Sequence, residues 1–82
     1  MESKVGIKEF LEFVAKRLVE KPDEVFVKEI EGASVTILEL KVAKEDFGRI
    51  LGKKGRIANA IRVLLKAVSG KEGRRTTLEI FE

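Results

Sequence analysis

The segment Gly52-Lys53-Lys54-Gly55-Arg56 combines two glycines with three basic residues, a combination that favours binding of an anion. Glycine has no side chain, so the backbone can turn sharply at Gly52 and Gly55, and a ligand can approach it closely. Lys53, Lys54 and Arg56 add positive charge beside the turn. A helix that starts there would also direct its first N–H groups and its positive dipole end at the ligand. The segment therefore predicts a phosphate site.

Two well-known phosphate motifs do not fit this segment. A Walker A loop requires four residues between its glycines and Lys-Ser or Lys-Thr after the second, whereas three residues separate Gly48 from Gly52 and Lys53-Lys54 follows. The dinucleotide pattern G-x-G-x-x-G is also absent, since the only glycines available are Gly48, Gly52 and Gly55. The sequence therefore gives no support to a P-loop or to a dinucleotide-binding loop.

The 82 residues are enough for one hydrophobic core, so we expect a single domain over residues 1–82. The chain has no cysteine and no histidine, which removes disulfides, thiolate nucleophiles, imidazole bases and nearly every transition-metal site. Glu45 and Asp46 are neighbours on a predicted helix and point in different directions, so they do not form a catalytic pair. We therefore expect no enzymatic activity, no cofactor and no metal.

Localisation and origin follow from composition. The start Met1-Glu2-Ser3-Lys4 lacks the apolar run of a secretory signal, and no apolar stretch approaches the ~20 residues that span a bilayer. Together with the missing cysteines, this predicts a cytoplasmic protein without a membrane partner. Glutamine is absent and Asn59 is the only asparagine, a bias similar to that of proteins from organisms that live at high temperature.

The positive charge of the chain is concentrated in one segment. Residues 41–75 carry eleven basic and three acidic side chains, whereas the chain as a whole has a formal net charge of +3. A strongly basic segment in an otherwise ordinary domain is typical of a surface that binds a polyanion. A solvated face of Lys and Arg is the alternative explanation of the same pattern.

Periodicity predicts the elements that position the glycine segment. An apolar stripe from Ile7 to Leu18 predicts an amphipathic helix that ends before Pro22. Residues 25–30 and 35–42 predict an antiparallel hairpin, with Leu38, Leu40 and Val42 on its core side. Helices are predicted at 44–51 and 55–68, followed by a basic turn at 70–75 and a strand at 76–81. In the second of these helices the predicted buried stripe comprises Ile57, Ile61, Leu64, Leu65 and Val68.

The stretch from Asp46 to Arg62, with Gly-Arg-Ile-Leu-Gly before the basic pair and Ala-Ile-Arg after it, resembles the core of a KH domain. The order αββααβ is similar to the type II form, which implies an α+β fold with a three-stranded mixed sheet and three helices packed on one face. In KH domains the GXXG loop clamps the backbone of about four nucleotides. Length and motif further resemble the small KhpA family of bacterial RNA-binding proteins, over essentially the whole chain. One departure is Ala58, which stands where many KH domains have isoleucine.

The resemblance implies a single-stranded RNA-binding protein, acting as an RNA chaperone or post-transcriptional regulator. Lys53, Lys54 and Arg56 would hold phosphates, and Arg49, Ile50, Ile57, Asn59 and Lys41 would line the adjacent groove for bases. A KH-fold protein-interaction module with little RNA affinity is the alternative, and single-stranded DNA is a further ligand that the sequence leaves open.

The aromatic side chains bear on the strength of binding and on partners. There is no Trp or Tyr, and we expect most of the five phenylalanines in the core, so binding by one domain should be weak and salt-dependent. Phe13 lies off the helix stripe, as part of a widened core face or as an oligomer contact. The KhpA resemblance implies self-association as a homodimer and pairing with the larger KH protein KhpB.

Overall fold

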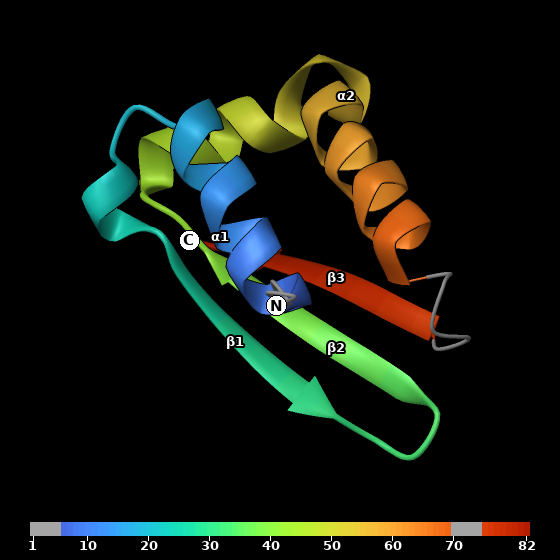
Figure 1. The fold of residues 1–82 in the computed structure, drawn as a ribbon. Helices are drawn as coiled ribbons and strands as arrows, with labels where there is room; N and C mark the ends of the chain where they lie inside the picture. Colours follow the sequence, from blue (N-terminus) through green and yellow to red (C-terminus); the bar gives the residue numbers. More distant parts are fainter. Residues whose placement is uncertain (1–5, 70–74) are drawn as a thin grey trace, which may run out of the picture.

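The computed structural model describes residues 6–69 and 75–82, which form one layer of helices on one layer of sheet (Figure 1). The elements follow in the order α1 (Ile7–Leu18), η1 (Pro22–Glu24), β1 (Phe26–Glu31), β2 (Val35–Lys41), α2 (Lys44–Ser69) and β3 (Arg75–Phe81). The predicted basic turn lies outside the described residues except for Arg75.

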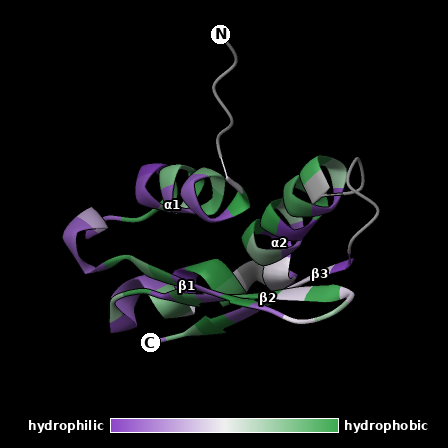
Figure 2. Cartoon of the chain, turned by 60° about the horizontal axis from the view of Figure 1, so that its bottom comes forward, coloured by the Kyte–Doolittle hydropathy of each residue, from purple (hydrophilic) through white to green (hydrophobic). Residues whose placement is uncertain are grey.

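The three strands form one mixed sheet in the order β1-β2-β3. β1 and β2 are antiparallel, and their turn is closed by the N–H of Gly32, which donates to the carbonyl of Val35 at 2.7 Å. β2 and β3 are parallel, so the chain must cross the sheet between them, and α2 makes this connection. Figure 2 shows that α1 and α2 lie on the same side of the sheet. The predicted α+β architecture with a mixed sheet is therefore confirmed.

The core lies between the helices and one face of the sheet. Thr36, Leu38 and Leu40 of β2 are buried and alternate with residues that face away from the helices, which confirms the predicted faces of this strand. Leu11 and Ala15 of α1 and Ala58, Ile61 and Leu65 of α2 fill the helix side. The outer face of the sheet carries no helix in the part of the chain that the structure describes.

The predicted stripe of the second helix is partly wrong. Leu64 is 43% exposed and Val68 is 38% exposed, and Ala58 takes a place in the core instead. The reason is geometric, because the stripe 58, 61 and 65 faces the sheet, and Leu64 lies about 100° around the helix from Leu65. Small Ala58 lets the helix approach the sheet closely.

The expectation that most phenylalanines are in the core is also wrong. Phe13 is 58% exposed, so the widened core face is excluded, and the guanidinium carbon of Arg17 lies 4.7 Å from the centre of its ring. Phe26 and Phe81 are exposed at the outer face of the sheet, because each stands at a strand position whose side chain points away from the helices. Only Phe10 and Phe47 pack against the core, and both remain partly exposed.

None of the described helices has the length and apolar character needed to cross a membrane. Within residues 6–69 and 75–82, no three His, Cys, Asp or Glu side chains gather as metal ligands would.

Candidate nucleic-acid interface

The two helices predicted at 44–51 and 55–68 are joined in α2, whose ribbon bends sharply where the glycine segment lies (Figure 1). Lys54 and Gly55 have φ angles of 63° and 70°, in the left-handed region. These two residues divide α2 into an N-terminal arm, residues 44–53, and a C-terminal arm, residues 56–69. The structure therefore realises the predicted turn as a break in backbone conformation inside one long helix.

Lys54 is strained at this bend, whereas Gly55 is not. A residue with a Cβ in the left-handed conformation costs roughly 1–2 kcal/mol, a penalty that glycine escapes. Lys54 is the only residue other than glycine with positive φ in the described part of the chain. Because such strain concentrates at binding and active sites, the bend is the first place to look for function.

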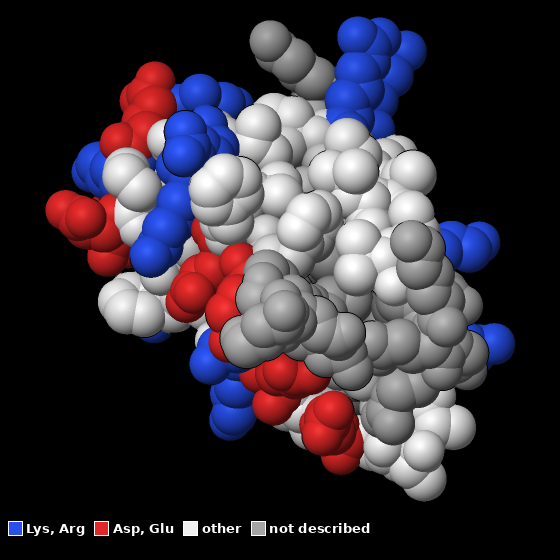
Figure 3. Space-filling view, in the orientation of Figure 1, with Lys and Arg blue, Asp and Glu red and all other residues white. Residues whose placement is uncertain are grey.

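The surface above the bend is open. A Cβ atom built on Gly52 or on Gly55 meets no other atom within 4 Å, and the side chains of Lys54 and Arg56 are exposed. The side chain of Lys53 lies outside the described part of the structure. Figure 3 shows Lys and Arg atoms projecting at the top of the molecule, over the bend of α2. An anionic ligand can therefore reach the backbone and meet positive charge there.

We expect Gly55→Ala to destabilise the protein by about 1–2 kcal/mol, because alanine must adopt the left-handed φ. Gly48→Ala is the matched control, since Gly48 lies in the N-terminal arm with open space around its Cβ position and without positive φ. Alanine there should stabilise by about 0.5–1 kcal/mol. Urea unfolding followed by circular dichroism measures both, and equal effects of the two substitutions would refute the left-handed bend.

The structure separates the other residues that the sequence placed at the site. Ile50 is buried in the core, Ile57 packs against the core, and Asn59 is exposed on the C-terminal arm. Lys41 stands at the end of β2 on the outer face of the sheet, which faces away from α2. The bend therefore gathers Gly52, Lys54, Gly55 and Arg56, while Ile50 and Lys41 face elsewhere.

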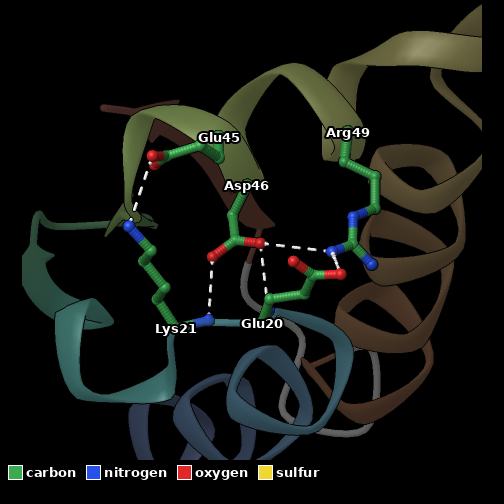
Figure 4. A network of polar contacts seen from close by, with 5 residues as sticks. All are labelled: Glu20, Lys21, Glu45, Asp46 and Arg49. Carbon is green, nitrogen blue, oxygen red and sulfur yellow. Dashed lines mark hydrogen bonds and ion pairs between the residues drawn. The ribbon is translucent and has the colours of Figure 1, made fainter.

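Arg49 lies one helical turn before Gly52 and belongs to a polar network (Figure 4). Its Nη2 atom is 2.7 Å from Oε2 of Glu20 and 3.7 Å from Oδ1 of Asp46. Glu20 lies just beyond α1, so the Arg49 side chain reaches across to the segment that follows α1. Both Arg49 and Glu20 remain partly exposed, and exposed ion pairs of this kind contribute little to stability.

Asp46 is the centre of this network and is only 1% exposed. The backbone N–H groups of Glu20 and Lys21 donate to its two carboxylate oxygens at 3.0 and 3.1 Å. These bonds fasten the segment after α1 to the N-terminal arm of α2. Sequence reasoning missed this role, because no local pattern reveals contacts between positions 25 and 26 residues apart.

Lys21 and Glu45 form an exposed pair beside the network, with Nζ 3.2 Å from Oε2. The hydrogen bond to Glu45 and its negative charge raise the pKa of Lys21. A hydrogen bond from the backbone, followed by the contact with Lys21, lowers the pKa of Glu45. Each partner therefore favours the charged form of the other, at the surface.

Comparison with known families decides where this architecture belongs. The model of the family described as KhpA/KhpB, KH domain, matches residues 8–80. The chain belongs to the KhpA/KhpB family. The match runs from α1 to β3 and includes the bend of α2, so the predicted KH fold is confirmed together with the family.

Several bacterial members of the KhpA/KhpB family are similar to the chain over nearly its whole length, and each is named RNA-binding protein KhpA. The Clostridium acetobutylicum protein is 54% identical over 75 residues, which cover 92% of this chain and 100% of the relative. The Borreliella burgdorferi protein is 53% identical, covering 90% of each chain. The Chlamydia trachomatis protein is 49% identical, covering 93% of this chain and 97% of the relative.

Solved structures of Era contain the same fold within a larger chain. Aquifex aeolicus Era bound to GDP and aluminium fluoride matches 99% of this chain with a TM-score of 0.69 and 23% identity. Era in complex with a GTP analogue and a fragment of 16S ribosomal RNA matches 92% of it with a TM-score of 0.61 and 25% identity. This KhpA/KhpB chain corresponds to about a third of the Era chains, 32% and 29%, so the likeness concerns the fold.

Proposed function

We propose that this chain binds single-stranded RNA through the bend of α2. The observation that carries the proposal is the left-handed turn at Lys54 and Gly55, which is exposed, has open space above its glycines and bears basic side chains. The names of the KhpA relatives support RNA as the ligand. We place this activity in the cytoplasm, as that of an RNA chaperone or post-transcriptional regulator.

The clamp works through the backbone and through charge. A phosphate can settle against Gly52 and Gly55 because no side chain stands in its way. Lys53, Lys54 and Arg56 neutralise neighbouring phosphates, and the C-terminal arm of α2 adds its positive dipole end. In KH domains such a loop holds about four nucleotides. These contacts position the strand without reading its sequence.

Base contacts at the bend are sparse. Asn59 offers both a donor and an acceptor on the exposed side of the C-terminal arm, and Ile57 offers a half-buried apolar surface. Arg49 can reach the strand only by leaving Glu20, a contact that is inexpensive to break because it is exposed. No aromatic side chain belongs to the glycine segment itself. The affinity for RNA should therefore depend mainly on contacts with phosphate groups and should fall strongly as the salt concentration rises.

Salt dependence gives a direct test. With three phosphates neutralised, raising monovalent salt from about 50 to 200 mM should weaken binding to a short single-stranded RNA roughly 20-fold. Fluorescence anisotropy measures this, with the single-stranded DNA of the same sequence as a comparison for recognition of the 2′-OH. Binding that is equally tight at both salt concentrations would contradict a phosphate clamp.

An apolar stripe on the C-terminal arm favours a second role in protein association. Leu64 and Val68, which are 43% and 38% exposed, form an apolar stripe along the flank of this arm, and Val63, which is 66% exposed, lies on the side turned away from the sheet. Figure 3 shows a wide uncharged area over this arm. A self-complementary helix face can pair with its own copy about a two-fold axis. We propose that the stripe joins two copies of this chain, or this chain and a KhpB-like partner.

Leu64→Lys should shift the native chain from dimer to monomer, because a charge at the centre of an apolar contact loses its hydration without gaining a partner. Sedimentation velocity measures the change. Ile30→Lys is the control, since Ile30 has similar exposure on the outer face of the sheet. A native chain that is monomeric, or an equal effect of both substitutions, would refute the stripe as a contact.

A further inference from the structure

The outer face of the sheet carries two exposed aromatic rings in one row. Lys41 of β2 pairs with Phe26 of β1 on one side and with Phe81 of β3 on the other. Phe26 is 61% exposed and Phe81 is 44% exposed. Exposed rings at matching positions of two strands keep apolar surface in water, and contact with a ligand would bury it. This row lies on the face opposite α2, so it is separate from the clamp (Figure 2).

The two rings border a hollow of about 450 Å³. Phe26 and Phe81 stand on strands that are two steps apart in the sheet, which is roughly 10 Å. Lys41 stands between them on β2, so a flat ring midway must lie over the flexible stem of Lys41, about 5 Å from each phenylalanine and within the 4.5–7 Å range of aromatic pairs. The spacing of the strands therefore suits the insertion of one planar aromatic group.

The polar groups of the hollow define what kind of ring fits. Lys28 and Lys41 supply donors, and Glu39 and Glu82 supply acceptors. In the described part of the chain these four side chains have no hydrogen bond or ion pair, so they are available to a ligand. Their charges cancel, which makes the hollow unsuitable for a phosphate but suitable for a neutral group with donors and acceptors on its edge.

A nucleobase has this combination of properties. It is flat, neutral and apolar on its faces, and its edge carries both donors and acceptors. An aliphatic side chain of a protein would contact the rings but leave the four polar groups unused. We propose that the outer face of the sheet holds one unpaired nucleobase between Phe26 and Phe81, with Lys41 and Glu39 at its polar edge. The proposal rests on the RNA-binding function only for the source of the base.

Free nucleosides test this site independently of the clamp, because adenosine and uridine carry no phosphate. NMR titration of the native chain should shift the amide and ring signals of Phe26 and Phe81 and leave the α2 bend unchanged. The same shifts should appear in the variant with Lys53→Asp and Lys54→Asp. Shifts confined to the bend, or no shifts at all, would overturn the proposal whatever the clamp does with RNA.

Substitution of the rings completes the test. Phe26→Leu with Phe81→Leu should weaken nucleoside binding about 10-fold, since stacking on an aromatic side chain typically contributes this much or more per base. Both side chains are exposed, so leucine should preserve the fold. Phe13→Leu is the matched control, because Phe13 is similarly exposed on α1. Equal binding by the double variant, or signals of this face that change with protein concentration alone, would overturn the nucleobase site and indicate a protein contact.

Discussion

Exchange of Lys53 and Lys54 for aspartate is expected to lower the affinity for single-stranded RNA by roughly 100-fold or more at moderate salt. The substitution removes two cations and places two anions beside the phosphates, so attraction becomes repulsion. The fold should survive, because Lys54 is exposed and aspartate tolerates its left-handed φ better than most residues. Anisotropy with a short RNA measures the loss, and circular dichroism should remain unchanged.

A control of equal charge separates a clamp from general attraction. Lys16→Asp with Lys44→Asp changes the net charge by the same amount, and both lysines are exposed and distant from the bend in sequence. We expect this control to weaken RNA binding by less than about threefold, through long-range charge alone. Equal losses in the two variants would show that net charge, rather than the bend, attracts RNA. Unchanged binding by the Lys53 and Lys54 variant would favour a protein-interaction module.

The elements that depend on local pattern could be predicted from the sequence. Alternation along β2 identifies its core side, since a strand side chain can point only to one of two faces. The glycine segment identifies the bend, because glycines between two helical patterns favour a turn, and the left-handed conformations fall at Lys54 and Gly55. The sequence predicts two helices and the structure has one bent helix, and this difference involves only the conformations of Lys54 and Gly55.

Features that depend on packing between distant segments could not be predicted. Alternation along the strands puts Phe26 and Phe81 on the outer face, and only the fold shows that no helix of the described chain packs over them there. In the same way, Leu64 and Leu65 are equally apolar, and the rotation of α2 against the sheet decides that Leu65 is buried. Sequence patterns report which residues are apolar, whereas the tertiary fold decides which apolar residues have a partner.

Asp46 illustrates the same limit at a polar residue. Its sequence neighbour Glu45 is also a carboxylate in the first turn of α2, and both suit the positive end of a helix. Yet Glu45 is exposed, whereas Asp46 is buried and accepts two backbone hydrogen bonds from the segment after α1. Only the direction of the side chain separates the two, and that direction depends on where α1 ends in space.

Asp46→Ala should therefore destabilise the protein by about 3 kcal/mol, because the N–H groups of Glu20 and Lys21 lose a charged acceptor in a partly buried place. For a domain of this size the melting temperature should fall by roughly 15 °C or more. Asp46→Asn should cost about half as much, since the amide oxygen can still accept one of the two bonds. Thermal unfolding followed by circular dichroism measures both changes.

Glu45→Ala is the matched control for Asp46, because it removes the adjacent carboxylate and leaves the buried network intact. Its melting temperature should stay close to that of the native chain. The Asp46 variants should also bind RNA normally well below their melting temperatures, since the bend lies in the open and Asp46 does not contact it. If Asp46→Ala melts like Glu45→Ala, the bonds to Glu20 and Lys21 do not hold the segment after α1 against α2.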